Sequence, residues 1–294
     1  MGKIVFYIMT VKGLEALRHA CDTSSESIRY VVVGRDVNVK NDFSNAITEL
    51  AYQYGIPCFY RGEEPSVDPR DYILAISWRW MIEHPERKLI IFHDSLLPKY
   101  RGFAPLVNML INGENQIGVS AIFGAKEYDR GDIIGQRSSA ISYPITISEA
   151  IEINLQNFKV LIRDVVEKIS HGVDLIGTAQ SEADATYSIW RDEEDYRINW
   201  SNSAKEIKRF IDAVGFPYLG ASCLVNGSQV RILQAEVVDD LYCELRHVGK
   251  VLFVDSGMPT VICGKGLLRI TEAMVSGDEE ISFLPMAKFR SRFV

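Results

Sequence analysis

The sequence has few cysteines, and none of them form a close pair. The five are an odd number among 294 residues, widely spaced and without a Cys-x-x-Cys motif: Cys21, Cys58, Cys223, Cys243 and Cys263. This spacing excludes a disulfide framework and argues against a zinc site, since both need clustered cysteines. We interpret the five as small core residues of a protein in a reducing compartment.

Long apolar runs are also absent. The apolar stretches run four to eight residues, whereas a transmembrane helix needs roughly 20. The apolar segment at residues 4–9 is too short for a signal peptide, and no small-residue cleavage site follows it. We therefore interpret this segment as a buried strand and expect a cytoplasmic protein with no membrane partner.

An excess of positive charge is missing too. Lysine and arginine number 32 against 39 aspartate and glutamate, which gives a net charge of −7. A nucleic-acid surface would have to form against this overall charge, because phosphate contacts dominate such binding. We therefore expect no nucleic-acid partner. Hydrophobic residues make up 47% and charged residues 24%, values typical of a soluble globular protein, and the length suits two domains.

The first 178 residues alternate short β-rich runs with helical patterns. Strands are predicted at 3–9, 28–34, 72–77, 88–93 and 118–123, with a helix at 43–54. Apolar runs without strict alternation indicate strands that are covered on both faces. The fold class predicted for residues 1–178 is α/β: a Rossmann-like, mainly parallel sheet with helices on both faces.

The clearest helix is predicted at residues 148–170. Thr146 and Glu149 have the spacing of a capping box, and Gly172 lies where the helix is expected to end. Apolar residues recur at spacings of three and four, namely Ile151, Leu155, Phe158, Ile162, Val165 and Ile169. We expect this stripe to pack against the sheet.

The composition changes after this helix. Residues 179–198 are polar and acidic and are interpreted as a linker. Residues 199–294 contain a helical pattern at 203–214, followed by five short β-runs at 221–225, 229–238, 250–254, 260–263 and 267–270. Asn226-Gly227 is typical of a hairpin turn. An OB-like β-barrel domain is the prediction for residues 199–294.

Several common α/β motifs are missing. The sequence has no G-x-G-x-x-G, no P-loop and no G-x-S-x-G elbow, which disfavours a dinucleotide enzyme, a P-loop NTPase and an α/β hydrolase. Ligands of open α/β sheets bind at the carboxyl ends of strands. One predicted strand ends at His93, and a loop with Lys99 and Arg101 follows. Another is followed by an acidic loop that contains Asp129.

A histidine beside a carboxylate suits proton transfer, and a basic loop suits an anionic substrate. Arginine can bind a phosphate with two parallel hydrogen bonds. A histidine at a strand end is also commonly a packed or solvated residue, so this pattern alone does not define an enzyme.

Residues 93–102, His-Asp-Ser-Leu-Leu-Pro-Lys-Tyr-Arg-Gly, resemble the H-x-S-L-L-P-[KR]-[YW]-R-G signature of the 10-formyltetrahydrofolate-dependent formyltransferases. Residues 129–134 are similar to that family's D-x-G-x-I/M motif, and residues 195–200 to the D-x-x-I-x-W segment that precedes its C-terminal domain. The resemblance covers nearly the whole chain. It implies a one-carbon transferase with 10-formyltetrahydrofolate as co-substrate and no metal.

The resemblance also implies roles for particular residues. The catalytic residues would be His93, which stabilises the oxyanion of the tetrahedral intermediate, and Asp129, which supports this histidine and proton removal from the amine. The folate would be bound by Trp80, Met81, Ile82 and Tyr128, and the substrate by Ser95, Lys99, Tyr100, Arg101 and Gly102. Trp78 and Trp80 can also be explained as core or interface aromatics.

One position departs from the family pattern. The family has an asparagine two residues before the histidine, and this chain has Ile91. Loss of one oxyanion donor costs about 3–4 kcal/mol of barrier, or two to three powers of ten in rate. Ser77, Ser95 and Asn108 are candidate replacements. A non-catalytic relative that binds folate or a nucleotide sugar is therefore a second hypothesis.

The sequence indicates the identity of the acceptor amine less directly than it indicates formyl transfer. Residues 75–82 and 97–102 are similar to the amino-sugar branch of the family, and residues 32–42 carry no basic insertion of the kind that methionyl-tRNA formyltransferases have. We therefore expect a nucleotide-linked amino sugar, such as a 4-amino-4,6-dideoxyhexose of surface glycan or pseudaminic-type synthesis, with its diphosphate near Lys99 and Arg101. A methionyl-tRNA formyltransferase is the alternative, and a homodimer is left open.

Overall fold

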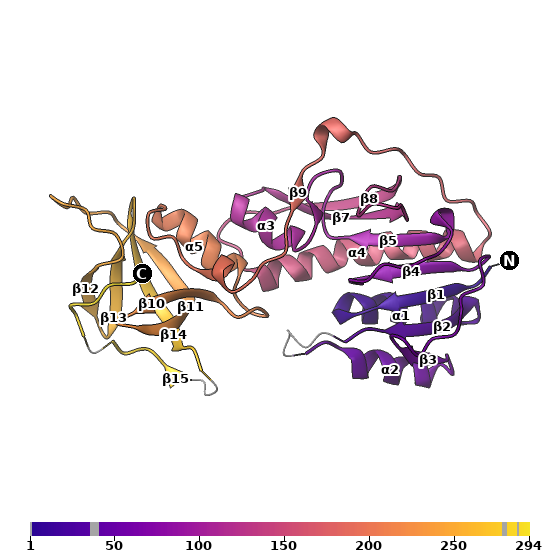
Figure 1. Ribbon diagram of the computed structural model, residues 1–294, viewed down its shortest axis with the longest axis horizontal. Helices are drawn as coiled ribbons and strands as arrows, with labels where there is room; N and C mark the ends of the chain where they lie inside the picture. The colour runs from indigo at the N-terminus through magenta and orange to yellow at the C-terminus, as the bar shows by residue number, and fades with distance from the viewer. Residues whose placement is uncertain (1, 36–40, 278–280, 287) are drawn as a thin grey trace. The chain divides into compact units, whose positions relative to one another are not determined.

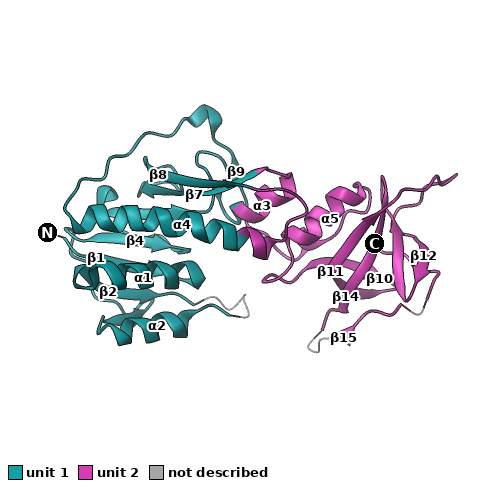
Figure 2. Ribbon diagram, turned by 180° about the vertical axis from the view of Figure 1, so that it is seen from behind, with its two compact units in different colours: residues 1–105, 116–140, 151–189 teal, residues 106–115, 141–150, 190–294 magenta. Residues whose placement is uncertain are grey.

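The structure is a computed structural model that describes residues 2–35, 41–277, 281–286 and 288–294. Its contacts divide the chain into two compact units (Figures 1 and 2). Unit 1 holds residues up to 105 together with 116–140 and 151–189, and unit 2 holds 106–115, 141–150 and 190–294. The chain therefore passes between the units several times, and the domain limits expected at 178 and 198 stay a prediction.

Unit 1 is built on one seven-stranded sheet with the order β3-β2-β1-β4-β5-β7-β8. Its parallel part consists of β1 (Ile4–Ile8), β2 (Ile28–Val33), β3 (Cys58–Tyr60), β4 (Tyr72–Ile76) and β5 (Leu89–His93). Two antiparallel strands, β7 (Gln116–Phe123) and β8 (Ile133–Ala140), complete it. The predicted α/β class with a mainly parallel sheet is confirmed.

Three helices cover one face of this sheet: α1 (Thr10–Ser24), α2 (Ser44–Gln53) and α4 (Ile147–Ser170). Their apolar side chains share one core with Phe6, Ile8 and Phe92 of the strands. The stripe of α4 packs on the sheet as expected, with the rings of Phe158 and Phe92 5.2 Å apart. The capping box is present as well, since Glu149 accepts from the Thr146 amide at 2.8 Å and donates its own amide to the Thr146 hydroxyl at 3.3 Å.

Helices were expected on both faces, but among the described residues no such helix layer covers the other face. Its core residues, among them Val5, Tyr7 and Ile73, are covered by side chains from strand ends and loops: Phe59, Val67, Trp78, Ile82 and Ile91. The crossover from β3 to β4 spans only residues 61–71 and contains Pro65 and Pro69. A proline inside a helix removes a hydrogen bond and clashes with the preceding turn, so this short crossover stays irregular.

Unit 2 is built on an antiparallel sheet with the order β10-β11-β14-β13-β12, and β15 pairs with β14. The strands are β10 (Ala221–Val225), β11 (Ser228–Val238), β12 (Val251–Asp255), β13 (Met258–Ile262), β14 (Leu267–Val275) and β15 (Ile281–Ser282). Helix α5 (Ala204–Ala213) begins with a complete capping box between Ser203 and Glu206, and α3 (Pro105–Asn112) starts at a proline.

The last residues of the chain connect the two edges of this sheet. Phe293 pairs with Val225 of β10, and Arg292 pairs with Lys250, just before β12. The Leu224 amide donates to the carbonyl of Val294 at 2.8 Å. Closure of this kind satisfies edge strands that would otherwise be open to pairing with other chains. The OB-like description of this unit stays a prediction.

No helix in the described ranges is both long enough and apolar enough to cross a bilayer.

Candidate active site

His93 is the last residue of β5, at the place where the sheet changes from parallel to antiparallel pairing. Strand β5 pairs in parallel with β4 and in antiparallel with β7, where Ser120 lies opposite His93. His93 is 8% exposed. The sheet therefore delivers this imidazole, nearly buried, to the carboxyl edge where ligands of such sheets bind.

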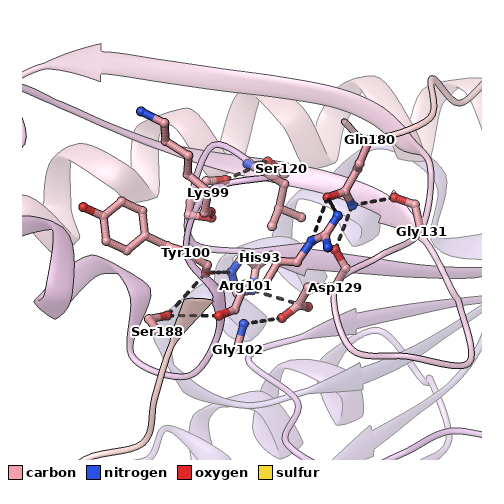
Figure 3. A network of polar contacts seen from close by, with 12 residues as sticks. His93, Lys99, Tyr100, Arg101, Gly102, Ser120, Asp129, Gly131, Gln180 and Ser188 are labelled. Atoms are coloured by element: carbon pink, nitrogen blue, oxygen red, sulfur yellow. Dashed lines mark hydrogen bonds and ion pairs between the residues drawn. The ribbon is translucent and has the colours of Figure 1, made fainter. Parts of the chain in front are cut away.

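Asp129 lies beside His93, as the sequence predicted. Its Oδ1 is 3.5 Å from His93 Nδ1, and its Oδ2 accepts a hydrogen bond from the Gly102 amide at 2.7 Å (Figure 3). The other ring nitrogen of His93 lies 2.7 Å from the carbonyl oxygen of Tyr100. A carbonyl oxygen only accepts, so Nε2 carries a proton and donates to it, and Nδ1 is the nitrogen that faces the carboxylate.

The D-x-G motif around Asp129 has a direct structural reason. Asp129 adopts a left-handed backbone conformation with φ of 55°, which aspartate tolerates better than most residues. Two residues later, a Cβ on Gly131 would lie 1.7 Å from the carbonyl oxygen of Phe123. Only glycine fits there, and this close approach fixes the turn that presents the Asp129 carboxylate.

The loop after His93 is held by a chain of hydrogen bonds. The Ser95 hydroxyl donates to the Lys99 carbonyl at 2.6 Å, and the Ser120 hydroxyl donates to the Ser95 carbonyl at 2.7 Å. The Gln136 amide donates to Ser120 Oγ at 2.7 Å and to the Leu97 carbonyl at 2.9 Å. Ser95 is fully buried, so its hydroxyl holds the loop.

The predicted substrate residues of this loop have different environments. Lys99 is exposed and Tyr100 half-buried, and Figure 3 shows both side chains pointing away from Asp129. Arg101, in contrast, is 0% exposed. Its guanidinium donates to Glu182 at 2.8 and 2.9 Å and to Gln180 at 2.9 and 3.1 Å. The Arg101 guanidinium, which was expected to bind phosphate, is thus occupied by residues of the chain itself.

This ion pair alters the acidity of its partners. Hydrogen bonding to Arg101 lowers the pKa of the Glu182 carboxyl below its ordinary value. Hydrogen bonds from Arg101 and Arg130 lower the pKa of the Tyr187 hydroxyl as well. The charge of Arg101 is therefore balanced inside unit 1, as a buried cation requires.

The segment after α4, which the sequence suggested to be a linker, forms part of the site. Strand β6 (Arg101–Gly102) pairs in parallel with β9 (Tyr187–Ser188). Gly102 has φ of 101°, and a Cβ there would lie 2.4 Å from the Ser188 carbonyl oxygen. Sequence reasoning missed Gln180 and Glu182. The one available signal was a cluster of polar residues directly before the β-type run Thr186-Tyr187-Ser188.

The predicted folate residues lie after β4 and in the Asp129 loop. Trp80 is half-buried, with its ring 5.0 Å from that of Trp78 and the Arg61 guanidinium 4.3 Å above it. Met81 is 58% exposed, and Ile82 packs against the second core of the sheet. Tyr128 is 61% exposed, with its ring 6.4 Å from that of Phe103.

Ile91 lies in a row of residues across the sheet, opposite Ala75 of β4 and Ile122 of β7. The hydroxyl of Ser77, one candidate replacement for the missing amide, lies 3.0 Å from that of Thr10. Asn108, another candidate, accepts from Arg191 within unit 2 at 3.5 Å. Trp78 packs against the same core as Ile91, and its Nε1 is buried without a hydrogen-bond partner in the described structure.

Comparisons with known proteins identify the family to which the chain belongs. A family model described as "Formyl transferase" matches residues 71–160, and one described as "Formyl transferase, C-terminal domain" matches residues 191–288. A methionyl-tRNA formyltransferase of Syntrophomonas wolfei is 30% identical over 307 residues, which cover 100% of this chain and 94% of that protein. The chain belongs to the formyl transferase family, whose members are enzymes that transfer a formyl group.

Two solved structures share the fold. WlaRD, a sugar 3N-formyl transferase whose crystals were obtained in the presence of dTDP and 5-N-formyl-THF, superposes with a TM-score of 0.70 at 17% identity, covering 92% of this chain and 97% of that one. An N-formyltransferase from Helicobacter canadensis, in complex with folinic acid and dTDP-3-aminofucose, gives 0.71 at 16% identity, covering 92% and 99%. At these identities the likeness concerns the fold alone.

Proposed function

We propose that the chain transfers a formyl group from 10-formyltetrahydrofolate to the amine of a nucleotide-linked amino sugar. The observation that carries this proposal is the His93–Asp129 pair at the end of β5, with 3.5 Å between Nδ1 and Oδ1. WlaRD and the Helicobacter enzyme are named as N-formyltransferases, and their structures were determined with folates and dTDP compounds. This supports a folate and a nucleotide sugar as the two substrates.

In the proposed reaction, residues of the chain accept a proton from the amine and stabilise the negative charge that develops on the formyl oxygen. An amine that becomes an amide must lose a proton, and the Asp129 carboxylate with the His93 ring is the acceptor at this strand end. The folate, when bound, supplies the formyl group: the amine nitrogen bonds to the formyl carbon, the bond from that carbon to the folate N10 breaks, and N10 takes up a proton as tetrahydrofolate leaves. The Gly102 amide fixes one carboxylate oxygen, which leaves the other directed towards the imidazole.

The residues after β4 fit a folate ring system. Trp80 and Ile82 offer apolar surface, and Met81 is exposed beside them. The unpartnered Nε1 of Trp78 is a buried donor, and a pterin carries ring nitrogens and a carbonyl that accept hydrogen bonds. An unpaired buried donor is costly, so an acceptor supplied by a ligand would be favourable. We propose Trp80, Met81, Ile82 and Tyr128 as the folate contacts.

For the acceptor, the proposal places the diphosphate at Lys99. This lysine is exposed, and its ammonium can approach a phosphate as a point charge. The hydrogen-bond donors of three other predicted substrate residues bind groups of the chain itself, namely those of Ser95, Arg101 and Gly102. We propose that these three residues hold the shape of the loop that carries Lys99 and Tyr100. A cytoplasmic location accompanies this choice of substrates, and a homodimer stays a prediction.

A methionyl-tRNA formyltransferase is the second candidate, because the Syntrophomonas protein with that name aligns along this whole chain. Against it stands the net charge of −7, since binding of tRNA depends on phosphate contacts. Of the stretch that lacks a basic insertion, residues 36–40 lie outside the described residues. The two candidates differ in a measurable way: tRNA binding would weaken steeply with salt.

The test is direct formyl transfer. Purified protein is incubated with 10-formyltetrahydrofolate and UDP-, dTDP- or GDP-linked amino sugars, and in parallel with methionyl-tRNA, and each acceptor is examined by mass spectrometry. The proposal expects one formyl group on a sugar nucleotide and none on the tRNA. Formylation of methionyl-tRNA alone would establish the second candidate, and folate binding without any product would show a non-catalytic relative.

A further inference from the structure

Gln180 joins the two loops that carry the catalytic pair. Its Oε1 accepts hydrogen bonds from Arg101 Nε at 3.1 Å and Nη2 at 2.9 Å. Its Nε2 donates to the carbonyl oxygens of Asp129 and Gly131, both at 2.7 Å (Figure 3). One primary amide thus uses its acceptor on the loop after β5 and both of its protons on the loop after β7.

The anchor on the first of these loops is rigid. Arg101 is completely buried, and Glu182 neutralises it with two parallel hydrogen bonds of 2.8 and 2.9 Å. Main-chain bonds support the same contact, because the Arg101 amide donates to Thr186 at 2.9 Å and the Phe103 amide to Ser188 at 3.0 Å. A buried arginine with all of these partners does not move without breaking several of them.

The second loop needs such support. Asp129 has φ of 55°, a conformation that aspartate tolerates better than most residues but that still costs energy and is stabilised by the surroundings. The two carbonyls that Gln180 binds lie at Asp129 itself and at the glycine two residues later. Holding them fixes the backbone from which the carboxylate is directed at His93.

We propose that Gln180 is a positioning residue of this enzyme: it sets the Asp129 carboxylate relative to His93 by clamping the carbonyls of residues 129 and 131 to buried Arg101. The consequence for turnover rests on the proposed formyl transfer. The consequence for the loop does not, because it concerns only the order of residues 127–132.

The test compares Gln180→Leu with Gln136→Leu in the full chain. Gln136 is a matched control, because its side-chain nitrogen also donates to a main-chain carbonyl beside the site, that of Leu97, but to none in the loop around Asp129. Hydrogen exchange followed by mass spectrometry should show faster exchange in residues 127–132 for Q180L and no change there for Q136L. Gln180→Glu, which keeps the acceptor for Arg101 and loses the donors, should loosen the same residues and provides the test if Q180L does not fold.

Turnover supplies the second readout. Misplacement of a reacting group by about 1 Å can cost about 100-fold in rate, so Q180L should lower kcat by about 10- to 100-fold with KM nearly unchanged. In an Asp129→Asn background the same change should have almost no further effect, since the group it positions is gone. An equal loss in both backgrounds, or unchanged exchange in residues 127–132, would overturn the inference. Absence of turnover in the unaltered protein would count against the proposed function alone, and the exchange result would still decide the role of Gln180.

Discussion

His93 and Asp129 face each other across 3.5 Å at the carboxyl edge of the sheet, although 36 positions separate them in the sequence. Each is restrained from its other side, His93 by the Tyr100 carbonyl and Asp129 by the Gly102 amide. Both restraints come from the same short loop after β5. The signature segment 93–102 therefore supplies the histidine and also the main-chain groups that orient the pair.

Removing the charge of Asp129 should abolish most turnover and leave the fold intact. A positioned acid or base contributes about 10²–10⁴-fold, so Asp129→Asn is expected to lower kcat by that factor. Its isosteric amide should leave the thermal midpoint nearly unchanged. Asp132→Asn is the matched control, because this carboxylate lies in the same loop and pairs with Arg87 at 3.4 Å. Equal losses of kcat in both variants would show that Asp129 contributes only a negative charge to this loop, as Asp132 does, and is not a proton acceptor beside His93.

Gly131→Ala should damage the site through the backbone. The added Cβ would lie 1.7 Å from the Phe123 carbonyl oxygen, so the turn must move and Asp129 with it. We expect destabilisation of about 1–3 kcal/mol and a fall in kcat, measured by thermal unfolding and initial rates. Gly277→Ala is the control, since this glycine, like Gly131, lies outside the left-handed region but has open space at its Cβ. A G131A variant with full activity would contradict the explanation of the D-x-G motif.

Ile91 offers a gain-of-function test. Asparagine at this position restores an amide two residues before His93, and a single oxyanion donor is worth about two to three powers of ten. Ile91→Asn should therefore raise kcat by about 10-fold or more, and lower stability by about 1–3 kcal/mol because an amide replaces apolar packing. Ile91→Val should change neither much. An unchanged rate in I91N would show that another donor already serves, and the unpartnered Trp78 Nε1 is the group to examine next.

Thiol reactivity should follow burial. Burial raises the pKa of Cys223 and of Cys263 to about 12 and that of Cys21 to about 11. A raised pKa keeps the native thiol protonated, so stability should decrease as the pH rises above about 9, where unfolded thiols already release protons. At pH 8, iodoacetamide should label the partly exposed Cys243 first and these three only after unfolding. Fast native labelling of Cys223, seen in a peptide mass map, would contradict the packed core of unit 2.

The sequence predicted the regular elements well where one local pattern was decisive. The apolar runs of β1, β4 and β5 and the stripe of α4 follow from buried faces, and all were found where expected. Helix α1 was expected only as one of the helical stretches between strands, without bounds, because Gly13 interrupts the helical pattern near its start. The lack of a helix layer on the second face of the sheet, as far as the structure describes the chain, was not predicted, since the irregular course of residues 61–71 depends on their packing.

Only His93, the loop that follows it and Asp129 could be predicted from the sequence. The family signature identified His93 and the loop after it, and the D-x-G motif identified Asp129. The burial of Arg101 was not foreseen, because its partners Gln180 and Glu182 lie 79 and 81 residues away. Contacts at such separation leave no local pattern in a single sequence, and a polar segment that closes over a buried arginine resembles a linker until its hydrogen bonds are known.

The central claim is that the His93–Asp129 pair performs formyl transfer, and a single-turnover experiment tests it most directly. Enzyme in excess is mixed with 10-formyltetrahydrofolate and the sugar nucleotide, and formylated product is followed over time for the unaltered chain and for His93→Asn. The account predicts product in the first and a rate lower by about 10²–10⁴-fold in the second, with folate binding retained in both. Equal rates would contradict the account and would place the chemistry elsewhere in the molecule.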